Sequence, residues 1–295
     1  MRGWWQDLTD LVLPADCTGC GAPRTVLCPR CRAALCGRAP RRVWPVPEPA
    51  GLPVVHAAAP YAQEVRTLLL AHKERGVLVL AGALGAALAG AVRAGFGGGA
   101  GVPGGVGVGP RSGAGRVDPV LLVPVPSARW AVRARGHDPV RRIALAAARE
   151  LRRTGTPARV AAVLRQRRPV ADQAGLDARR RLANVAGALE VTAGGDRLLG
   201  AGQVVLVDDL ITTGASLAEA ARAVRDVAEE RTGVSTAVYG AVTREGRDER
   251  RTAVREETGK WVHGAPEKGA GNTLRYALQA AVIGAPLDSF EINRN

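Results

Sequence analysis

Aromatic residues are scarce in this chain. Phe, Trp and Tyr make up 3% of its 295 residues, although hydrophobic residues as a whole make up 46%. Any core must therefore be built mainly from Ala, Val and Leu. The length accommodates one ordinary domain with a small appendage, or two modest domains.

Cysteine is absent beyond residue 36. All five cysteines lie in the N-terminal part, at positions 17, 20, 28, 31 and 36. This distribution excludes a disulfide scaffold for the main body. It is more typical of a metal site in a reducing compartment, so we expect a cytoplasmic protein.

Long hydrophobic runs are also missing. The first residues, MRGWWQDLTDLVLPADC, contain no apolar segment long enough for a secretory signal. The segment Gly76–Val92 is uncharged, but it is rich in Ala and Gly and shorter than the ~20 apolar residues of a membrane span. We expect a buried helix there and no membrane span.

Acidic residues are outnumbered by basic ones. The chain has 27 Asp and Glu against 41 Lys and Arg, a formal net charge of +14. Such a charge favours an anionic partner, which nucleic acid, a phosphorylated metabolite or an acidic membrane would each satisfy. A basic surface that reflects only frequent Arg usage is equally consistent with these numbers.

The chain divides into three parts by composition. Residues 1–45 carry the cysteines, with a Pro- and Arg-rich linker predicted over 37–53, and residues 50–245 alternate between apolar runs and helical patterns. A Gly-rich stretch at 95–115 has the composition of a flexible insertion. Residues 246–295 form a charged tail with one apolar patch, Ala277–Ile283, to which we assign no role.

The alternation predicts an α/β domain with a parallel sheet covered by helices. Two apolar runs have the character of strands buried on both faces, and an Asp138-Pro139 pair marks the start of a helix. The expected strands are Val54–Ala59, Pro119–Val125, Val160–Leu164, Gln203–Val207 and Val234–Val242. The expected helices lie at Val65–His72, Val77–Ala94, Val140–Leu151 and Leu217–Val227.

The segment Val204–Leu217, VVLVDDLITTGASL, carries the strongest chemical pattern. Asp208 and Asp209 end a buried strand, and a polar turn then opens a helix. Backbone N–H groups at a helix N-terminus bind phosphate, Gly214 allows close backbone approach, and carboxylates accept hydrogen bonds from a diol or orient hydrated Mg²⁺. The predicted phosphate-binding residues are Thr212, Thr213, Gly214, Ala215 and Ser216.

Three other interpretations of this segment are weaker. A helix cap beside a solvated acid pair explains the turn, but it does not explain two adjacent like charges at a strand end. A receiver-type signalling domain needs more strand–helix units than follow Leu210. A nucleotide-binding P-loop needs a Gly-Lys-Ser or Gly-Lys-Thr sequence after a Gly-rich turn, which this chain lacks.

The Asp-Asp and Thr-Thr-Gly segment resembles the signature of type I phosphoribosyltransferases that binds 5-phosphoribosyl-1-pyrophosphate (PRPP). Residues 17–243 more widely resemble the ComF-type competence proteins. The other matching pieces are Lys73 in LLLAHKERG, the segment VPVPSARWAVRARGHDP at 123–139, QAGLDARRRLAN at 173–184 and the N-terminal Cys pairs. Departures from that pattern are His137-Asp138-Pro139 in place of Phe-Asn-Gln, and Leu189 where an aromatic is usual.

The resemblance implies how the rest of a PRPP site is built. It implies that Asp208 and Asp209 act at the ribose with Mg²⁺, and that the loop containing Ser127 holds the pyrophosphate through its amides. Arg133, Arg135 and Lys73 could neutralise that group, although each Arg alone is also an ordinary surface charge. The segment 165–181, with Gln173 and Arg181, is expected to cover the site.

The N-terminal cysteines form two Cys-x-x-Cys pairs. Cys17, Cys20, Cys28 and Cys31 can supply four thiolates to a structural zinc ion, with Gly19 and Gly21 allowing a tight turn. A cluster of free thiols or disulfides is the alternative, and Cys36 could substitute as a ligand.

Two functions follow as hypotheses. The first is a phosphoribosyltransferase that acts on PRPP and an acceptor, for which the sequence shows no recognisable nucleobase pocket. The second, implied by the ComF resemblance, is a non-catalytic PRPP-responsive protein that binds single-stranded DNA and works with competence or DNA-processing machinery.

Overall fold

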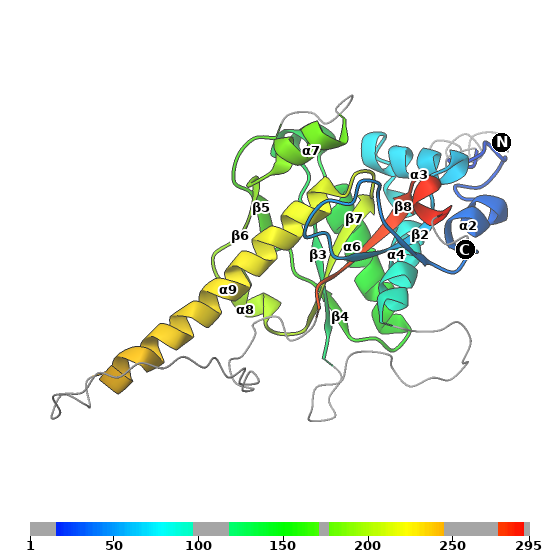
Figure 1. Ribbon diagram of the computed structural model, residues 1–295. Coiled ribbons are helices and arrows are strands. Elements are labelled where there is room, and N and C mark those ends of the chain that lie inside the picture. Colours follow the sequence, from blue (N-terminus) through cyan, green and yellow to red (C-terminus); the bar gives the residue numbers. More distant parts are fainter. Residues whose placement is uncertain (1–15, 97–117, 171–176, 245–276, 292–295) are drawn as a thin grey trace, which may run out of the picture.

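The computed structural model describes residues 16–96, 118–170, 177–244 and 277–291, which form a mixed α/β fold (Figure 1). A mostly parallel sheet of six strands lies between helices, and only the first strand pairs antiparallel with its neighbour. Across the sheet, the strands are β1 (Arg41–Val43), β2 (Val54–Pro60), β8 (Gln279–Ala285), β7 (Gln203–Leu210), β3 (Val120–Pro124) and β4 (Ala158–Val160). The expected fold class is confirmed at this level.

Helices cover both faces of the sheet. The described helices are α2 (Pro29–Cys36), α3 (Gln63–Glu74), the 3-10 helix η1 (Leu78–Leu80), α4 (Ala81–Gly95), α5 (Arg129–Arg135), α6 (Pro139–Arg153), α7 (Ala178–Val185), α8 (Gly195–Leu199), α9 (Ala215–Arg244) and α10 (Asp288–Glu291). Asp138 caps α6 as expected, because its carboxylate accepts a hydrogen bond from the N–H of Arg141 at 3.0 Å.

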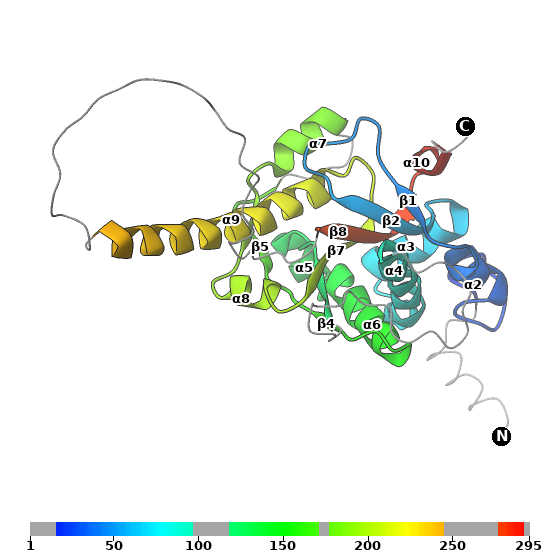
Figure 2. The same cartoon turned by 60° about the horizontal axis from the view of Figure 1, so that its bottom comes forward.

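Two apolar cores lie on opposite faces of the sheet. Successive side chains of a strand point to opposite faces, so Val205 and Val207 pack with α3, α4 and α6, while Val204 and Leu206 pack with the first turns of α9. Figures 1 and 2 show α9 on one side of the sheet and α4 and α6 on the other. This double coverage explains why the central strands are continuous apolar runs.

One described segment, Leu78–Gly95, is long and apolar enough to cross a membrane. It contains α4, whose Leu84, Leu88 and Val92 are buried in the core shared with α6 and the sheet. This packing is compatible with a soluble protein and agrees with the predicted buried helix.

The prediction of a strand at Val234–Val242 is wrong, because helix α9 continues through these residues to Arg244. The place in the sheet next to β7 is taken by β8, which pairs in parallel with both β7 and β2. β8 comes from the apolar patch to which the sequence assigned no role. The sheet therefore includes a strand from beyond residue 245, within the segment expected to be a charged tail.

Two smaller predictions also differ from the structure. Val160–Leu164 is not one strand: β4 ends at Val160 in the main sheet, and β5 (Leu164–Gln166) pairs with β6 (Leu189–Val191) in a separate antiparallel ribbon. The expected linker at 37–53 contains β1, because Val43 is apolar and buried at the sheet edge. Of the Gly-rich stretch expected at 95–115, Gly95 ends α4, and residues 97–115 lie outside the described residues.

The cysteine region packs directly on the main body. Cys31 and Leu35 belong to the same apolar core as Leu68 of α3, and Arg30 forms an ion pair with Glu64 at 2.9 Å. The N-terminal region therefore has no separate core of its own within the described residues.

Candidate functional site

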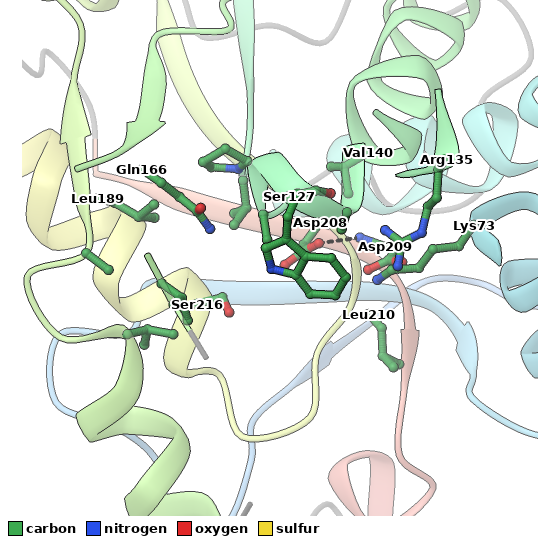
Figure 3. A pocket seen from close by; sticks show the side chains of 18 of the residues that line it. Lys73, Ser127, Arg135, Val140, Gln166, Leu189, Asp208, Asp209, Leu210 and Ser216 are labelled. Carbon is green, nitrogen blue, oxygen red and sulfur yellow. Dashed lines mark hydrogen bonds and ion pairs between the residues drawn. The ribbon is translucent and has the colours of Figure 1, made fainter. Parts of the chain in front are cut away.

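A cavity of about 340 Å³ lies at the carboxyl ends of β3 and β7. From β3 the chain continues to β4 toward one edge of the sheet, and from β7 it continues to β8 toward the other. Ligands of open α/β sheets bind in the crevice where connections diverge in this way. Figure 3 shows Asp208 and Ser127 near its centre, Gln166, Leu189 and Ser216 on one side, and Lys73 and Arg135 on the other.

The acid pair sits at the end of β7, as the sequence predicts. Asp209 is buried and accepts a hydrogen bond from Lys73 Nζ at 2.8 Å, whereas Asp208 is partly exposed and accepts one from the Asp209 N–H. Lys73 reaches the pair from the last turn of α3. Sequence-distant residues thus form one charged cluster at the cavity.

The protonation of the two acids is set by this cluster. Burial and the neighbouring Asp209 carboxylate raise the pKa of Asp208 well above its ordinary value. Burial also acts to raise the pKa of Asp209, but the Lys73 ammonium outweighs it and lowers that pKa. The Asp209 carboxylate in turn raises the pKa of Lys73 against its burial. Asp209 and Lys73 therefore form the charged pair, and Asp208 holds a proton more readily.

A row of unpaired backbone donors follows the acid pair. Ile211 still donates its N–H to Gly284 of β8 at 3.0 Å, but no described residue accepts from the N–H groups of residues 212–217. The hydroxyls of Thr213 and Ser216 also have no partner among the residues described. Six consecutive free N–H groups before and within the first turn of a long helix are a favourable environment for an anion.

Gly214 makes this turn possible. Its φ of +73° lies in the left-handed region, and a Cβ at this position would lie 3.2 Å from atoms of Leu52 and Pro45. The segment before β2 therefore packs against the outside of the turn. Ser216 and Thr212 line the cavity, while Gly214 and Ala215 are buried beside it.

The loop after β3 forms the opposite wall. Pro126, Ser127 and Ala128 line the cavity, and so does Arg135, which makes a bidentate ion pair with Glu74 at 2.7 and 2.9 Å. Arg133 is exposed on α5 and does not line the cavity. Of the three cations predicted for a pyrophosphate, Lys73 and Arg135 are at the site and Arg133 is not.

The β5–β6 ribbon and α7 form the remaining wall. Gln166 of β5 and Leu189 of β6 line the cavity, and Arg181 of α7 donates to the Thr212 hydroxyl at 3.2 Å. Arg181 therefore contacts the turn that the sequence predicts to bind phosphate. Gln173 lies outside the described residues.

An ion pair between the buried Glu219 and the partly exposed Arg222 fixes this ribbon to α9. Glu219 accepts a hydrogen bond from the Leu189 N–H at 2.9 Å, and Arg222 donates to the Leu189 carbonyl at 2.9 Å while it pairs with Glu219. Both backbone polar groups of Leu189 are thereby held by α9, the helix that follows the predicted phosphate-binding turn. No local sequence pattern predicts this clamp, because its partners are separated by about thirty residues.

Trp130 and Val140 also line the cavity but were not predicted as site residues. Trp130 is 59% exposed, which is unusual for an indole and consistent with contact to a ligand. A scarce aromatic immediately after the Pro126–Ala128 loop was the available signal.

The N-terminal cysteines converge as predicted. The sulfur atoms of Cys17, Cys20, Cys28 and Cys31 all lie within 4.8 Å of one another, and all are free thiols. Zn–S bonds of about 2.3 Å in a tetrahedron place sulfurs about 3.8 Å apart. The four cysteines thus fit a metal such as zinc.

Local geometry supports this cluster. Gly21 has a φ of +76°, and a Cβ on Gly19 would lie 2.7 Å from Cys31 Sγ, so both turns depend on glycine. The Cys28 N–H donates to Cys17 Sγ at 3.3 Å. Burial opposes the Cys17 thiolate, but backbone N–H groups outweigh it and lower the pKa of Cys17 to about 6. Cys36 is exposed and lies outside the cluster.

Comparison of the chain with protein-family models and with curated proteins found no match.

Proposed function

We propose that this chain binds PRPP at the β3–β7 cavity and, as a phosphoribosyltransferase of the ComF type, transfers the phosphoribosyl group to an acceptor. The observation that carries this proposal is the row of free N–H groups at residues 212–217, immediately after the acid pair on the same strand end. In PRPP, the 5-phosphate and the ribose diol are separated by a short distance that resembles the distance between these amides and the acid pair. We also propose that the sheet and its helices form a type I phosphoribosyltransferase fold.

Each part of PRPP has a matching wall in the cavity. The 5-phosphate accepts hydrogen bonds from the 212–217 amides, and the ribose hydroxyls donate to the acid pair. The pyrophosphate lies toward Ser127, with Lys73 and Arg135 as its cations. Asp208 presents a carboxylate to the cavity, which suits a hydrated Mg²⁺ that shares substrate phosphate oxygens.

The chemistry is displacement at the ribose C1. The C1–O bond breaks with its electron pair going to pyrophosphate, the acceptor nitrogen forms the new bond to C1, and its proton passes to water. Lys73 and Arg135 stabilise the negative charge that develops on the leaving group. Bound Mg²⁺ would add further charge neutralisation there. Gln166, Leu189 and the clamped ribbon shield the cation-like ribose from water.

The four cysteines complete the proposal as a structural zinc site. Four thiolates leave no open coordination position, so this metal would hold the N-terminal turns against α3 and take no part in the transfer.

Isothermal titration calorimetry with PRPP and Mg²⁺ tests the binding, and pyrophosphate release with candidate acceptors tests the transfer. Magnesium-dependent binding of one PRPP per chain is expected. Absence of binding would refute the site assignment. Binding with no turnover, together with salt-sensitive binding to single-stranded DNA, would instead support the accessory-protein hypothesis.

The affinity for PRPP with Mg²⁺ is expected to rise with pH. Asp208 must be ionised to bind the cation, and its raised pKa moves this ionisation above the range of an ordinary Asp. Affinity should therefore fall as pH is lowered through that pKa. Calorimetry between about pH 5 and 8 would measure the curve.

The Lys73→Met variant distinguishes titration of Asp208 from titration of the phosphate groups of PRPP. Lys73 lowers the pKa of Asp208, so its removal should shift the midpoint to higher pH, whereas the phosphate groups of PRPP titrate unchanged. An unmoved midpoint would show that Asp208 is not the titrating group.

Gly214→Ala is expected to weaken PRPP binding about tenfold or more, because strain in the left-handed region and contact with Leu52 displace the free amides. Gly194→Ala is the matched control, with a φ of +76° and no atom within 4 Å of an added Cβ. Both should lower the melting temperature slightly. Equal PRPP affinity in the two variants would argue against the amide cradle.

A further inference from the structure

The two cations at the β3–β7 cavity, Lys73 and Arg135, differ in where their acidic partners lie (Figure 3). Lys73 pairs with Asp209, which itself lines the cavity. Arg135 pairs with Glu74, which lines a neighbouring cavity of about 590 Å³ but not the first. Because Arg135 lines both cavities, its guanidinium lies between the candidate site and an acid outside that site.

The ion pair takes up one edge of the Arg135 guanidinium. Glu74 accepts a hydrogen bond from Nε at 2.9 Å and another from Nη2 at 2.7 Å. A guanidinium binds a carboxylate or a phosphate most strongly through two such parallel donors. Glu74 therefore occupies a pair of donors that an anion in the cavity could use, and its charge repels that anion.

The exposure of the two side chains indicates which partner can be released. Glu74 is 46% exposed, whereas Arg135 is only 19% exposed. A carboxylate that is half in water loses little when its partner leaves, but a largely buried guanidinium needs an anion beside it. Exchange of Glu74 for a phosphate group keeps Arg135 neutralised and returns the carboxylate to solvent.

The backbone of Arg135 is held without Glu74. Gly136 ends α5 with a φ of +73°, and the ring of His137 then lies against α3. Its two nitrogens lie 3.1 Å from the Arg135 carbonyl oxygen and 3.3 Å from that of His72. Since His137 links α3 and α5, the exchange requires rotation of the Glu74 side chain and no movement of either helix.

From these observations we infer that Glu74 is an internal competitor for Arg135, which neutralises the guanidinium before the ligand binds and weakens the binding of pyrophosphate. This inference rests on the proposed function, in which the pyrophosphate lies beside Arg135. The competition acts at this end of PRPP alone, because the 5-phosphate lies at the 212–217 amides. Weaker binding of pyrophosphate favours its release after the transfer.

The test is calorimetry of the full chain with two probes, inorganic pyrophosphate and ribose 5-phosphate. Glu74→Gln keeps the size of the side chain and removes its charge. This variant is expected to bind pyrophosphate about threefold to tenfold more tightly than the unaltered chain does. Its affinity for ribose 5-phosphate should change less than about twofold.

Two controls show whether the gain depends on Arg135. Glu64→Gln removes an acid from the same helix, where Glu64 pairs with Arg30 at 2.9 Å outside the site, and it should change neither affinity. Arg135→Met removes the cation for which Glu74 competes. In that background, Glu74→Gln should give no further gain in pyrophosphate affinity.

The outcomes separate the inference from the proposed function. Failure of PRPP and of both probes to bind the unaltered chain would overturn the proposed function, and the inference with it. If PRPP binds, an equal or lower pyrophosphate affinity in Glu74→Gln would overturn the inference alone. A gain that ribose 5-phosphate shares, or that persists in the Arg135→Met background, would reveal a general effect of charge and would also overturn it.

Discussion

Replacement of both Asp208 and Asp209 by Asn is expected to lower the affinity for PRPP with Mg²⁺ by at least about 100-fold. The double variant removes the carboxylates that we propose accept hydrogen bonds from the ribose hydroxyls and hold the cation. It also leaves the Lys73 ammonium without its partner at 2.8 Å. Calorimetry of the double variant measures the loss directly.

A matched control is Glu150→Gln, which neutralises an acid that pairs with Arg153 on α6. It should bind PRPP as the unaltered chain does. If the double variant retained the affinity of this control, the acid pair would have no part in the site.

The two single variants are expected to differ in stability. The raised pKa of Asp208 means that the folded protein holds this proton more tightly than the unfolded chain does, so stability is lost as pH rises through the folded-state pKa. Asn cannot ionise, and Asp208→Asn should therefore raise the melting temperature at neutral pH. Asp209→Asn should lower it, because a largely buried Lys73 charge loses its partner. A higher melting temperature for Asp208→Asn together with a lower one for Asp209→Asn would show that keeping Asp208 at the site costs the fold stability.

Cys31→Ser is expected to have the largest effect on stability. Cys31 is fully buried, and its sulfur belongs to the four-cysteine cluster and to the core shared with Leu68. Binding of structural zinc contributes directly to folding, so loss of one ligand should reduce the free energy of unfolding by several kcal/mol and remove the metal. Mass spectrometry for zinc and thermal unfolding measure the two effects.

Cys36→Ser is the control for this prediction. Cys36 is exposed, and its only hydrogen bond among the described residues is a weak one to the Ala83 carbonyl at 3.9 Å. This variant should keep one zinc per chain and an unchanged melting temperature. Zinc retained in Cys31→Ser, or lost in Cys36→Ser, would contradict the assignment of the four ligands.

Local sequence patterns predicted the parts of the fold that are set by local chemistry. The apolar run ending in Asp208-Asp209, the Asp138-Pro139 helix start and the two Cys-x-x-Cys pairs each place their residues within a few positions, and the structure contains all three features. The α/β class followed from the same alternation of short segments.

Features set by distant pairing were not predictable in this way. The β-branched residues of Val234–Val242 favour a strand, but they belong to α9, and the strand that completes the sheet is supplied by Gln279–Ala285. Which apolar run enters a central sheet position depends on competition between segments far apart in the chain. Neither run carries that information alone.

Site residues that come from distant parts of the chain were also not predictable from local sequence patterns. Asp208, Thr212 and Ser216 were identified from one segment, whereas Trp130 and the clamp of Glu219 on Leu189 reach the site from separate elements. An isolated glutamate has no local pattern that distinguishes it from others of its type. Arg133 was included because it lies near Arg135 in sequence, but its position on α5 turns it away from the cavity.

A crystal structure of the chain with PRPP and Mg²⁺ tests the central claim most directly. The account predicts that the 5-phosphate lies among the backbone N–H groups of residues 212–217, with the ribose hydroxyls on Asp208 and Asp209. A phosphate bound elsewhere, with these six N–H groups still unpaired, would contradict it.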